Sequence, residues 1–97
     1  MTMNKDIILA KKDKILSIAS KYHASEIRLF GSFLHNTETA NSDVDFLVKW
    51  DANASLTDWS GLKRELEETL NRNVDIATDK SLHWYIRDKI LSEAQPL

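Results

Sequence analysis

The sequence predicts a mixed α/β (α+β) fold in which a small three-stranded sheet is covered by helices mainly on one face. Helical and strand-like patterns alternate along all 97 residues, without repeats or low-complexity segments. This length fits one hydrophobic core, so we expect a single domain over residues 1–97. The composition, 42% hydrophobic and 29% charged, is that of a folded protein rather than a disordered one.

The first half of the chain predicts a helix, a short strand and a tight turn. Residues 4–22 have helical periodicity, and residues 26–30 form a short strand. Gly31-Ser32 follows directly, then a turn or short helix to about residue 37, and a polar loop that ends at residue 42. The apolar side of the first helix carries Ile8, Ile15, Ala19 and Tyr22.

The second half predicts strand, helix, strand and helix. Residues 43–50 alternate, which places Val44, Phe46, Val48 and Trp50 on one face and Asp43, Asp45, Leu47 and Lys49 on the other. Ser55 or Thr57 could cap the next helix. A third strand covers residues 74–78, and a last helix runs from about residue 79 or 80 to 94. The apolar stripe of the middle helix is predicted to contain Trp59, Leu62, Leu66 and Leu70.

Charge and cysteine content exclude several classes of function. The net charge of −2 argues against a protein that binds polymeric DNA or RNA through phosphate attraction. The chain has no cysteine, so disulfides and thiolate metal sites are excluded. No stretch resembles a secretory signal or approaches the roughly 20 apolar residues of a membrane span, so we expect a cytoplasmic protein.

Three aspartates on predicted strands carry the chemistry. Asp43 and Asp45 are two residues apart on one strand, so both side chains point to the same face with Cα atoms about 6.5 to 7 Å apart. Two such charges repel each other unless a cation lies between them, and a divalent metal pair would suit them. Asp75 lies in the next strand and could share a metal or accept a proton if the strands are neighbours.

Gly31-Ser32 supplies a complementary feature. Glycine lets the backbone approach a ligand closely, and a strand-to-helix turn directs N–H groups towards an anion. The Ser32 hydroxyl adds a donor. Beside a metal pair, this turn could hold the β- and γ-phosphates of a nucleoside triphosphate. His35, by its position, and Lys49, on the aspartate face of its strand, are further candidates for phosphate contact.

Each of these features also has an ordinary interpretation. A Gly-Ser after a strand is most often only a turn. An Asp-x-Asp pair is usually solvated surface, and a single strand aspartate can be an edge charge that prevents aggregation. Three carboxylates are also compatible with a structural calcium site. The order of the features along the chain, Gly-Ser, then Asp-x-Asp, then Asp, favours the chemical interpretation.

The combined motif resembles the polymerase-β-like nucleotidyltransferases, and most closely the minimal nucleotidyltransferase (MNT) group. The resemblance rests on Leu29 to Phe33, Ser42 to Val48 and Val74-Asp75-Ile76, and on the last helix with Ile86, Ile90-Leu91 and Glu93-Ala94. It implies the polymerase-β-like nucleotidyltransferase fold. It also implies that Gly31 and Ser32 contact nucleotide phosphates, that Asp43 and Asp45 bind two Mg²⁺ ions (Mn²⁺ is possible), and that Asp75 completes the metal site and acts as the base.

The resemblance further implies ATP as substrate and a HEPN-domain RNase toxin as partner in a hetero-oligomer. The chain would act as an antitoxin that transfers AMP onto a toxin tyrosine. Larger relatives have an extra domain that shapes the acceptor pocket, so we expect a second polypeptide to complete the site. One departure stands out: related sequences have Arg-Gly where this chain has His35-Asn36, and an imidazole contacts phosphate more weakly than a guanidinium.

Three hypotheses follow from the sequence. The first is an active adenylyltransferase that modifies a protein partner. The second, motivated by His35-Asn36, is a catalytically weak or inactive subunit that neutralises its toxin by binding alone. The third is nucleotidyl transfer to a small molecule or an RNA end.

Overall fold

The computed structural model describes residues 3–97 and contains a four-stranded mixed sheet with the strand order β3-β2-β1-β4. Three strands were expected; the fourth is a two-residue strand at the end of the chain. Along the chain, the elements are α1 (Lys5–Ala10), α2 (Lys12–Lys21), β1 (Ala24–Phe30), α3 (Ser32–His35), β2 (Val44–Trp50), α4 (Leu56–Leu70), β3 (Val74–Ala77), α5 (Trp84–Glu93) and β4 (Gln95–Pro96).

The two long strands, β1 and β2, form the centre of the sheet. They run antiparallel, with Leu29 opposite Phe46 and Phe30 opposite Asp45. β3 lies on the other side of β2 and runs parallel to it, whereas β4 pairs antiparallel with β1. β2 is therefore held from both sides, which fixes the direction of every side chain along it.

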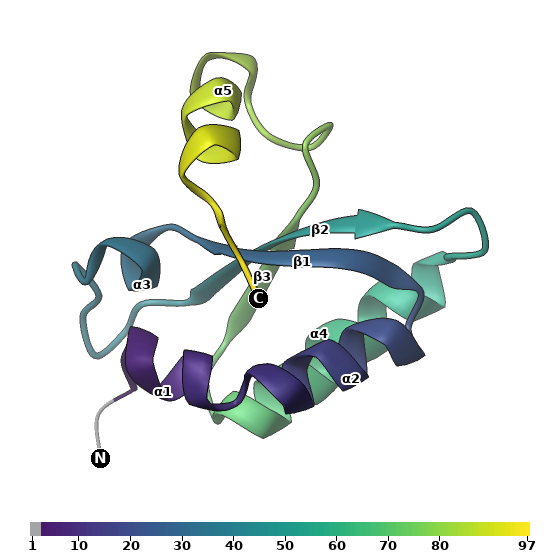
Figure 1. Ribbon diagram of the computed structural model, residues 1–97, viewed down its shortest axis with the longest axis horizontal. Helices are drawn as coiled ribbons and strands as arrows, with labels where there is room; N and C mark the ends of the chain where they lie inside the picture. The colour runs from purple at the N-terminus through teal and green to yellow at the C-terminus, as the bar shows by residue number, and fades with distance from the viewer. Residues whose placement is uncertain (1–2) are drawn as a thin grey trace.

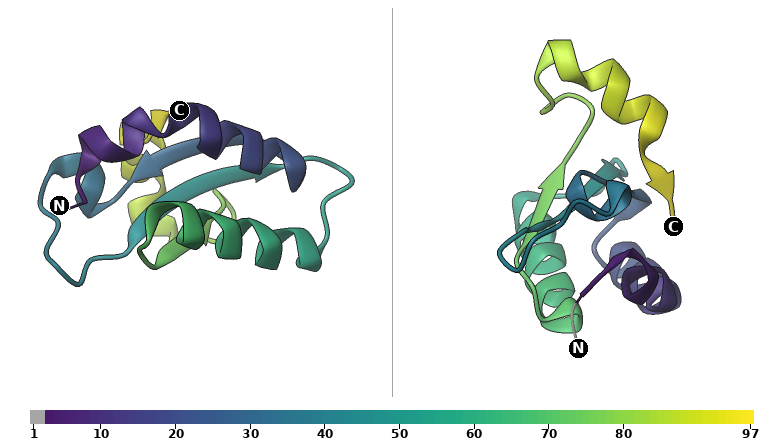
Figure 2. Two further views of the ribbon diagram at one scale, coloured as in Figure 1. Left: turned by 90° about the horizontal axis from the view of Figure 1, so that it is seen from below. Right: turned by 90° about the vertical axis from the view of Figure 1, so that its left-hand side faces the viewer.

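The helices are unequally divided between the two faces of the sheet. Figure 1 shows α1, α2 and α4 on one face and α5 alone on the other, and the end-on view in Figure 2 shows the same separation. The expectation that helices pack mainly on one face is confirmed.

The core lies between the sheet and the α1, α2 and α4 side. Val44 and Phe46 are fully buried and Val48 is 4% exposed, so the predicted core face of β2 is confirmed. Among the residues of the predicted helix stripe, Leu62, Leu66 and Leu70 are buried but Trp59 is 39% exposed, because it lies in the first turn of α4, at the rim of the sheet.

Two helix boundaries differ from the predictions. The first helix is interrupted at Lys11, whose backbone leaves helical geometry (φ −97°, ψ 14°) while its Nζ donates to the carbonyl of Thr69 (2.8 Å). The last helix begins at Trp84 rather than near residue 80, because Thr78 and Ser81 hydrogen-bond to each other in a closed turn.

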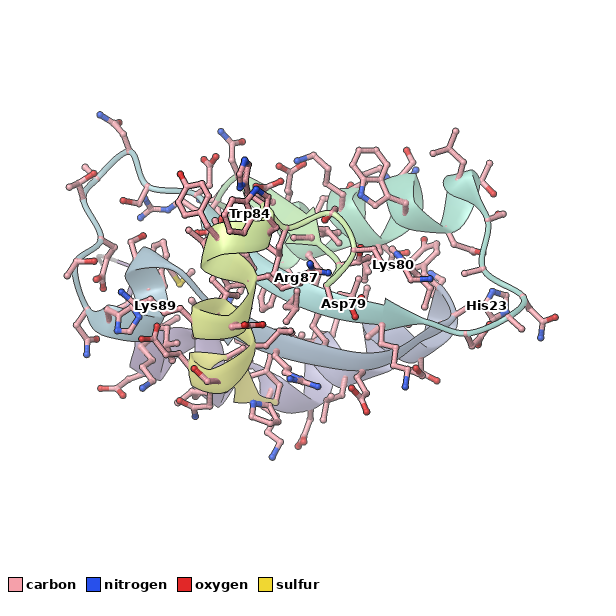
Figure 3. The ribbon with its side chains drawn as sticks, turned by 90° about the horizontal axis from the view of Figure 1, so that it is seen from above. His23, Asp79, Lys80, Trp84, Arg87 and Lys89 are labelled. Atoms are coloured by element: carbon pink, nitrogen blue, oxygen red, sulfur yellow. The ribbon has the colours of Figure 1, made fainter. Side chains whose placement is uncertain are left out.

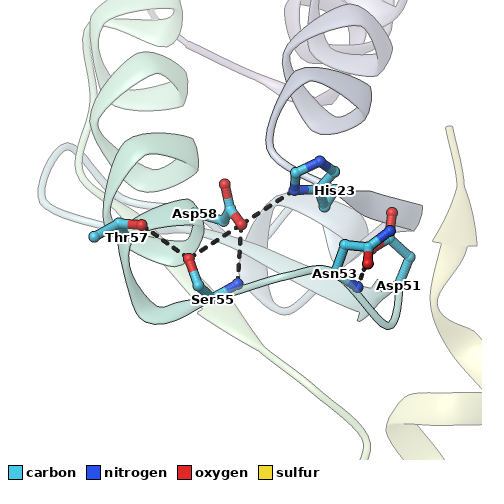
Figure 4. Close-up of polar contacts among 6 residues, drawn as sticks. All are labelled: His23, Asp51, Asn53, Ser55, Thr57 and Asp58. Carbon is cyan, nitrogen blue, oxygen red and sulfur yellow. Dashed lines mark hydrogen bonds and ion pairs between the residues drawn. The ribbon is translucent and has the colours of Figure 1, made fainter.

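The start of α4 is fixed by a capping box at Ser55. The carboxylate of Asp58 accepts a hydrogen bond from the backbone N–H of Ser55 (2.9 Å), and it also contacts Nδ1 of His23 (3.1 Å; Figure 4). The contact raises the pKa of His23 and lowers that of Asp58. It joins the end of α2 to the start of α4 on the core side of the sheet.

α5 is the least embedded of the helices, and none of its residues is buried. Trp84 (73% exposed) and Tyr85 (68% exposed) lie at its first turn, where their rings pack against each other and against His83. Figure 3 looks down on this helix where it crosses the sheet. None of the helices formed by residues 3–97 has the length and apolar character needed to cross a membrane.

Candidate active site

The register of β2 and β3 brings the predicted aspartates together. Asp45 lies directly opposite Asp75 in the parallel pair, and Asp43 immediately precedes β2. Neighbouring residues of adjacent strands point to the same face with Cα atoms about 4.8 Å apart. From the sequence, Asp75 was expected to join Asp43 and Asp45 only if the two strands were neighbours. In the structure β2 and β3 are neighbours.

The three carboxylates interact electrostatically. Burial raises the pKa of Asp45 to about 6, and the negative charges of Asp75 and then Asp43 add to the effect. Asp45 is half-buried, whereas Asp43 and Asp75 are exposed. A carboxylate that resists ionisation beside two others lacks a compensating positive charge, and a bound cation would supply it.

Gly31 places the turn after β1 against this cluster. It follows Phe30, the register partner of Asp45, and has a positive φ of 79°. A Cβ atom at this position would lie 2.2 Å from Oδ2 of Asp45, so no other residue fits without movement. The backbone thus passes as close to the carboxylate as glycine alone permits.

Ser32 begins the short helix α3 next to Gly31. Its carbonyl accepts a hydrogen bond from the backbone N–H of Thr37 (3.0 Å), and the carbonyl of Gly31 accepts from Leu34 (3.1 Å) and His35 (3.3 Å). These bonds close the expected turn between β1 and the loop. Gly31, Ser32 and the aspartates therefore occupy one end of the sheet.

The structure does not bring the other two candidates into this cluster. Nε2 of His35 contacts Oε2 of Glu93 at the end of α5 (2.9 Å). Lys49 is exposed four residues beyond Asp45, or about 13 Å further along β2. It borders a hollow of about 260 Å³ between the sheet and α5, together with Asp79 and Leu91.

The donor set fits Mg²⁺ better than a structural calcium ion. Within residues 3–97, no group of three or more His, Cys, Asp and Glu side chains is arranged to hold a metal by itself. Ca²⁺ requires six to eight oxygen ligands, whereas Mg²⁺ is usually bound by one or two carboxylates together with substrate phosphates. The paired carboxylates beside Gly31 suit an ion that arrives with a nucleotide.

One residue of this region was missed by the sequence interpretation. Arg72, between α4 and β3, directs its guanidinium at backbone carbonyls of the loop that precedes Asp43. A single arginine between two asparagines has no distinguishing pattern in the sequence, and its role depends on contacts with loop residues 30 to 33 positions away.

Known proteins share both the sequence and the fold. The family described as polymerase beta, nucleotidyltransferase, matches residues 13–97. A Methanocaldococcus jannaschii protein, provisionally named a protein adenylyltransferase, is 41% identical over 83 residues, which cover 86% of this chain and 89% of the relative. The protein adenylyltransferase MntA of Thermococcus cleftensis is 32% identical over 78% of this chain and 77% of its own length.

Solved structures agree. A provisionally assigned minimal nucleotidyltransferase superposes with a TM-score of 0.86 at 33% identity, covering 98% of this chain and 97% of the other. A toxin–antitoxin complex with AMP-PNP has a TM-score of 0.70 at 22% identity, covering 88% of this chain and 70% of that one, a likeness of fold alone.

The fold, the acid cluster and these similarities define an enzyme that transfers nucleotidyl groups. The chain belongs to the polymerase beta nucleotidyltransferase family. The fold and enzyme class implied by the sequence resemblance are thereby confirmed.

Proposed function

We propose that this protein transfers AMP from ATP to a hydroxyl group of a partner protein, a tyrosine of a HEPN toxin, and thereby acts as its antitoxin. The observation that carries the proposal is the meeting of Asp43, Asp45 and Asp75 beside Gly31 at one end of the sheet. Relatives named protein adenylyltransferases support it. So does the fold likeness to the MNT antitoxin in a complex with a tri-AMPylated Shewanella oneidensis HEPN toxin (TM-score 0.65, 18% identity, 91% of this chain and 69% of that one).

The residues of the site divide the work of the reaction. Asp43 and Asp45 would hold Mg²⁺, which supplies neutralisation of phosphate charge when bound with ATP. The turn at Gly31 and Ser32 would position the triphosphate. Asp75 would accept the proton of the acceptor hydroxyl. The oxygen of that hydroxyl bonds to the α-phosphorus as pyrophosphate leaves. A cytoplasmic location would supply the ATP.

The proposal is tested by incubating the protein and its HEPN partner with α-labelled ATP and Mg²⁺. Label should appear on the partner, and the Asp43→Asn or Asp45→Asn variant should lower the rate by at least about a hundredfold, since positioning and charge neutralisation provide nearly all of the catalysis. Asp13→Asn, an exposed change on α2 across the core, is the matched control and should leave the rate unchanged. Equal labelling by the Asp45→Asn variant would show that the acid cluster is not catalytic.

One observation favours a second candidate, an antitoxin that works by binding alone. Nε2 of His35 contacts Glu93. If this imidazole binds the phosphates of ATP only weakly, the protein would use ATP less effectively. In that case the Asp45→Asn variant would still protect cells that express the toxin. Under the first proposal this variant fails to protect them. Transfer to a small molecule would instead give label in a low-molecular-weight product.

A further inference from the structure

The side chain of Arg72 connects the two halves of the candidate active site. Its Nη1 lies 2.8 Å from the carbonyl oxygen of Ala40 and 3.4 Å from those of Thr39 and Ser42. All three carbonyls belong to the loop that leads from α3 to Asp43. Nη1 of one guanidinium thus binds the segment that immediately precedes the acid cluster.

The same guanidinium also contacts α3, the short helix that follows Gly31. Its central carbon lies 5.5 Å from the centre of the Phe33 ring, within the range of a cation–π contact. Phe33 is completely buried and follows Ser32 directly. Arg72 therefore contacts the element that carries Gly31 and Ser32 as well as the loop that carries Asp43.

Other contacts of the loop are mainly local. The N–H of Thr39 donates to Oγ of Ser42 (2.8 Å), and the N–H of Ser42 donates to the carbonyl of Thr39 (3.2 Å). These bonds shape a turn but do not attach it to the body of the protein. The end of the loop is attached to the body of the protein at Val44, the first residue of β2. The N–H of Val44 donates to the carbonyl of Asn73 (2.9 Å), and Asn73 follows Arg72 directly.

We propose that Arg72 is a positioning residue, which holds the loop so that Asp43 lies in the correct place relative to Asp45 and to the turn at Gly31. The proposal rests on the proposed function. Because Nη1 faces backbone carbonyls of the loop, the role assigned to Arg72 is to hold that loop rather than to bind the nucleotide. A planar guanidinium suits this task, since it can face several acceptors and an aromatic ring at once, which an ammonium group cannot.

The test compares Arg72→Ala and Arg72→Lys with the wild type and with Arg64→Ala. Arg64 is an exposed arginine of α4 whose guanidinium contacts the Tyr22 hydroxyl and not the loop, so its removal is a matched change of charge. Amide hydrogen exchange at Thr39 and Ser42 should be at least about tenfold faster in both Arg72 variants, while Phe46 and Val48 in β2 keep the wild-type rate. Arg64→Ala should exchange as the wild type does.

The kinetic arm separates positioning from binding. In both Arg72 variants, kcat for AMP transfer should fall by about tenfold or more with a smaller change in the KM for ATP, because a misplaced Asp43 affects the transition state more than the bound substrate. Arg72→Lys serves if Arg72→Ala fails to fold. The proposal is overturned if amide hydrogen exchange at Thr39 and Ser42 is unchanged in the Arg72 variants. It is also overturned if this exchange becomes faster while kcat stays at the wild-type value. Full recovery of kcat by lysine overturns it as well, since this would mean that charge alone matters.

Failure of the proposed function is distinguishable. If the wild type transfers no AMP, the proposed function fails, and the dissociation constant of Mn²⁺, measured by electron paramagnetic resonance on the protein alone, replaces kcat as the readout. Binding about tenfold weaker in the Arg72 variants than in Arg64→Ala then supports the positioning role. Equal binding overturns it.

Discussion

Gly31 shows how a single residue limits the site. A side chain there would meet Oδ2 of Asp45 at 2.2 Å, and the φ of 79° is unfavourable for any residue with a Cβ. Gly31→Ala should therefore displace the carboxylate, reduce AMP transfer by at least about tenfold and lower stability by about 1 kcal/mol or more. Transfer kinetics and thermal unfolding together measure both effects.

The other glycine of the chain provides the control. A Cβ on Gly61 would lie 2.3 Å from the ring of Tyr22, so Gly61→Ala should also destabilise the protein, although alanine favours a helix. Gly61 lies in α4, which packs on the core face of the sheet formed by Val44 and Phe46, away from the face of β2 that carries Asp45. Its variant should keep the wild-type kcat below its unfolding temperature. If both variants lose kcat equally, loss of stability rather than the contact with Asp45 explains the Gly31 result.

Asp45 gives the protein a specific pH dependence. Its pKa in the folded state, about 6, is above the value of 3.8 for an unperturbed aspartate, so between pH 4 and 6 the folded state binds more protons than the unfolded state. Its contribution to the free energy of unfolding is complete below pH 4 and is lost as the pH rises through 6. Asp45→Asn should therefore raise the Tm of the metal-free protein at pH 7, and the difference should disappear near pH 4.

A magnesium titration supplies the control for this prediction. Mg²⁺ at pH 7 should stabilise the wild type more than Asp45→Asn, because the variant keeps Asp43 but loses the second of the two carboxylates that would hold the ion. A Tm difference that is independent of pH would show that ionisation of the half-buried Asp45 is not its cause.

At the scale of elements, α4 and α5 have opposite roles in stability. Leu62 in α4 is fully buried, so Leu62→Ala should lower the free energy of unfolding by about 2–5 kcal/mol. Trp84 in α5 is 73% exposed. Trp84→Ser should therefore change the free energy of unfolding by no more than about 0.5 kcal/mol, although it removes more side-chain volume than Leu62→Ala does. Denaturant unfolding measures both. A large loss from the Trp84 variant would mean that α5 packs more closely than the structure shows.

The sequence predicted elements well where burial imposes a regular pattern. β2 follows the alternating pattern on its core face, where Val44, Phe46 and Val48 are buried as expected. On the face that carries the aspartates, the pattern breaks at Leu47, which is also buried (4% exposed). β4 has no such pattern, since two residues cannot alternate and Pro96 is a poor strand former. The break at Lys11 was also unpredictable, because no glycine or proline marks it and the lysine bonds to a distant carbonyl.

At the scale of the whole molecule, the predicted acid cluster depends on strand order, which no local pattern contains. The spacing of Asp43 and Asp45 places them on one face of a strand, but only the parallel pairing of β2 with β3 brings Asp75 opposite Asp45. Arg72 could not be found for the same reason, since its partners lie about 30 residues away. The contact of His35 with Glu93, 58 residues apart, was likewise outside the reach of local patterns.

That last contact joins α3, beside the predicted phosphate site, to the end of α5 on the outer face of the sheet. If His35 binds phosphate through Nε2, this nitrogen must first leave Glu93, so the two contacts compete. An exposed contact of this kind contributes about 0.2–1 kcal/mol, which corresponds to a factor of about 1.4 to 5 in affinity. Glu93→Gln should therefore lower the KM for ATP by up to about fivefold, with kcat unchanged.

The double variant shows whether the lower KM for ATP in Glu93→Gln is due to release of His35. His35→Ala should raise the KM for ATP, and adding Glu93→Gln to it should have no further effect, because the competing imidazole is gone. Steady-state kinetics of the four proteins form a complete cycle. A KM that falls equally in the presence and absence of His35 would mean that Glu93 repels the nucleotide directly through its charge, and His35 would then be no more than the link between α3 and α5.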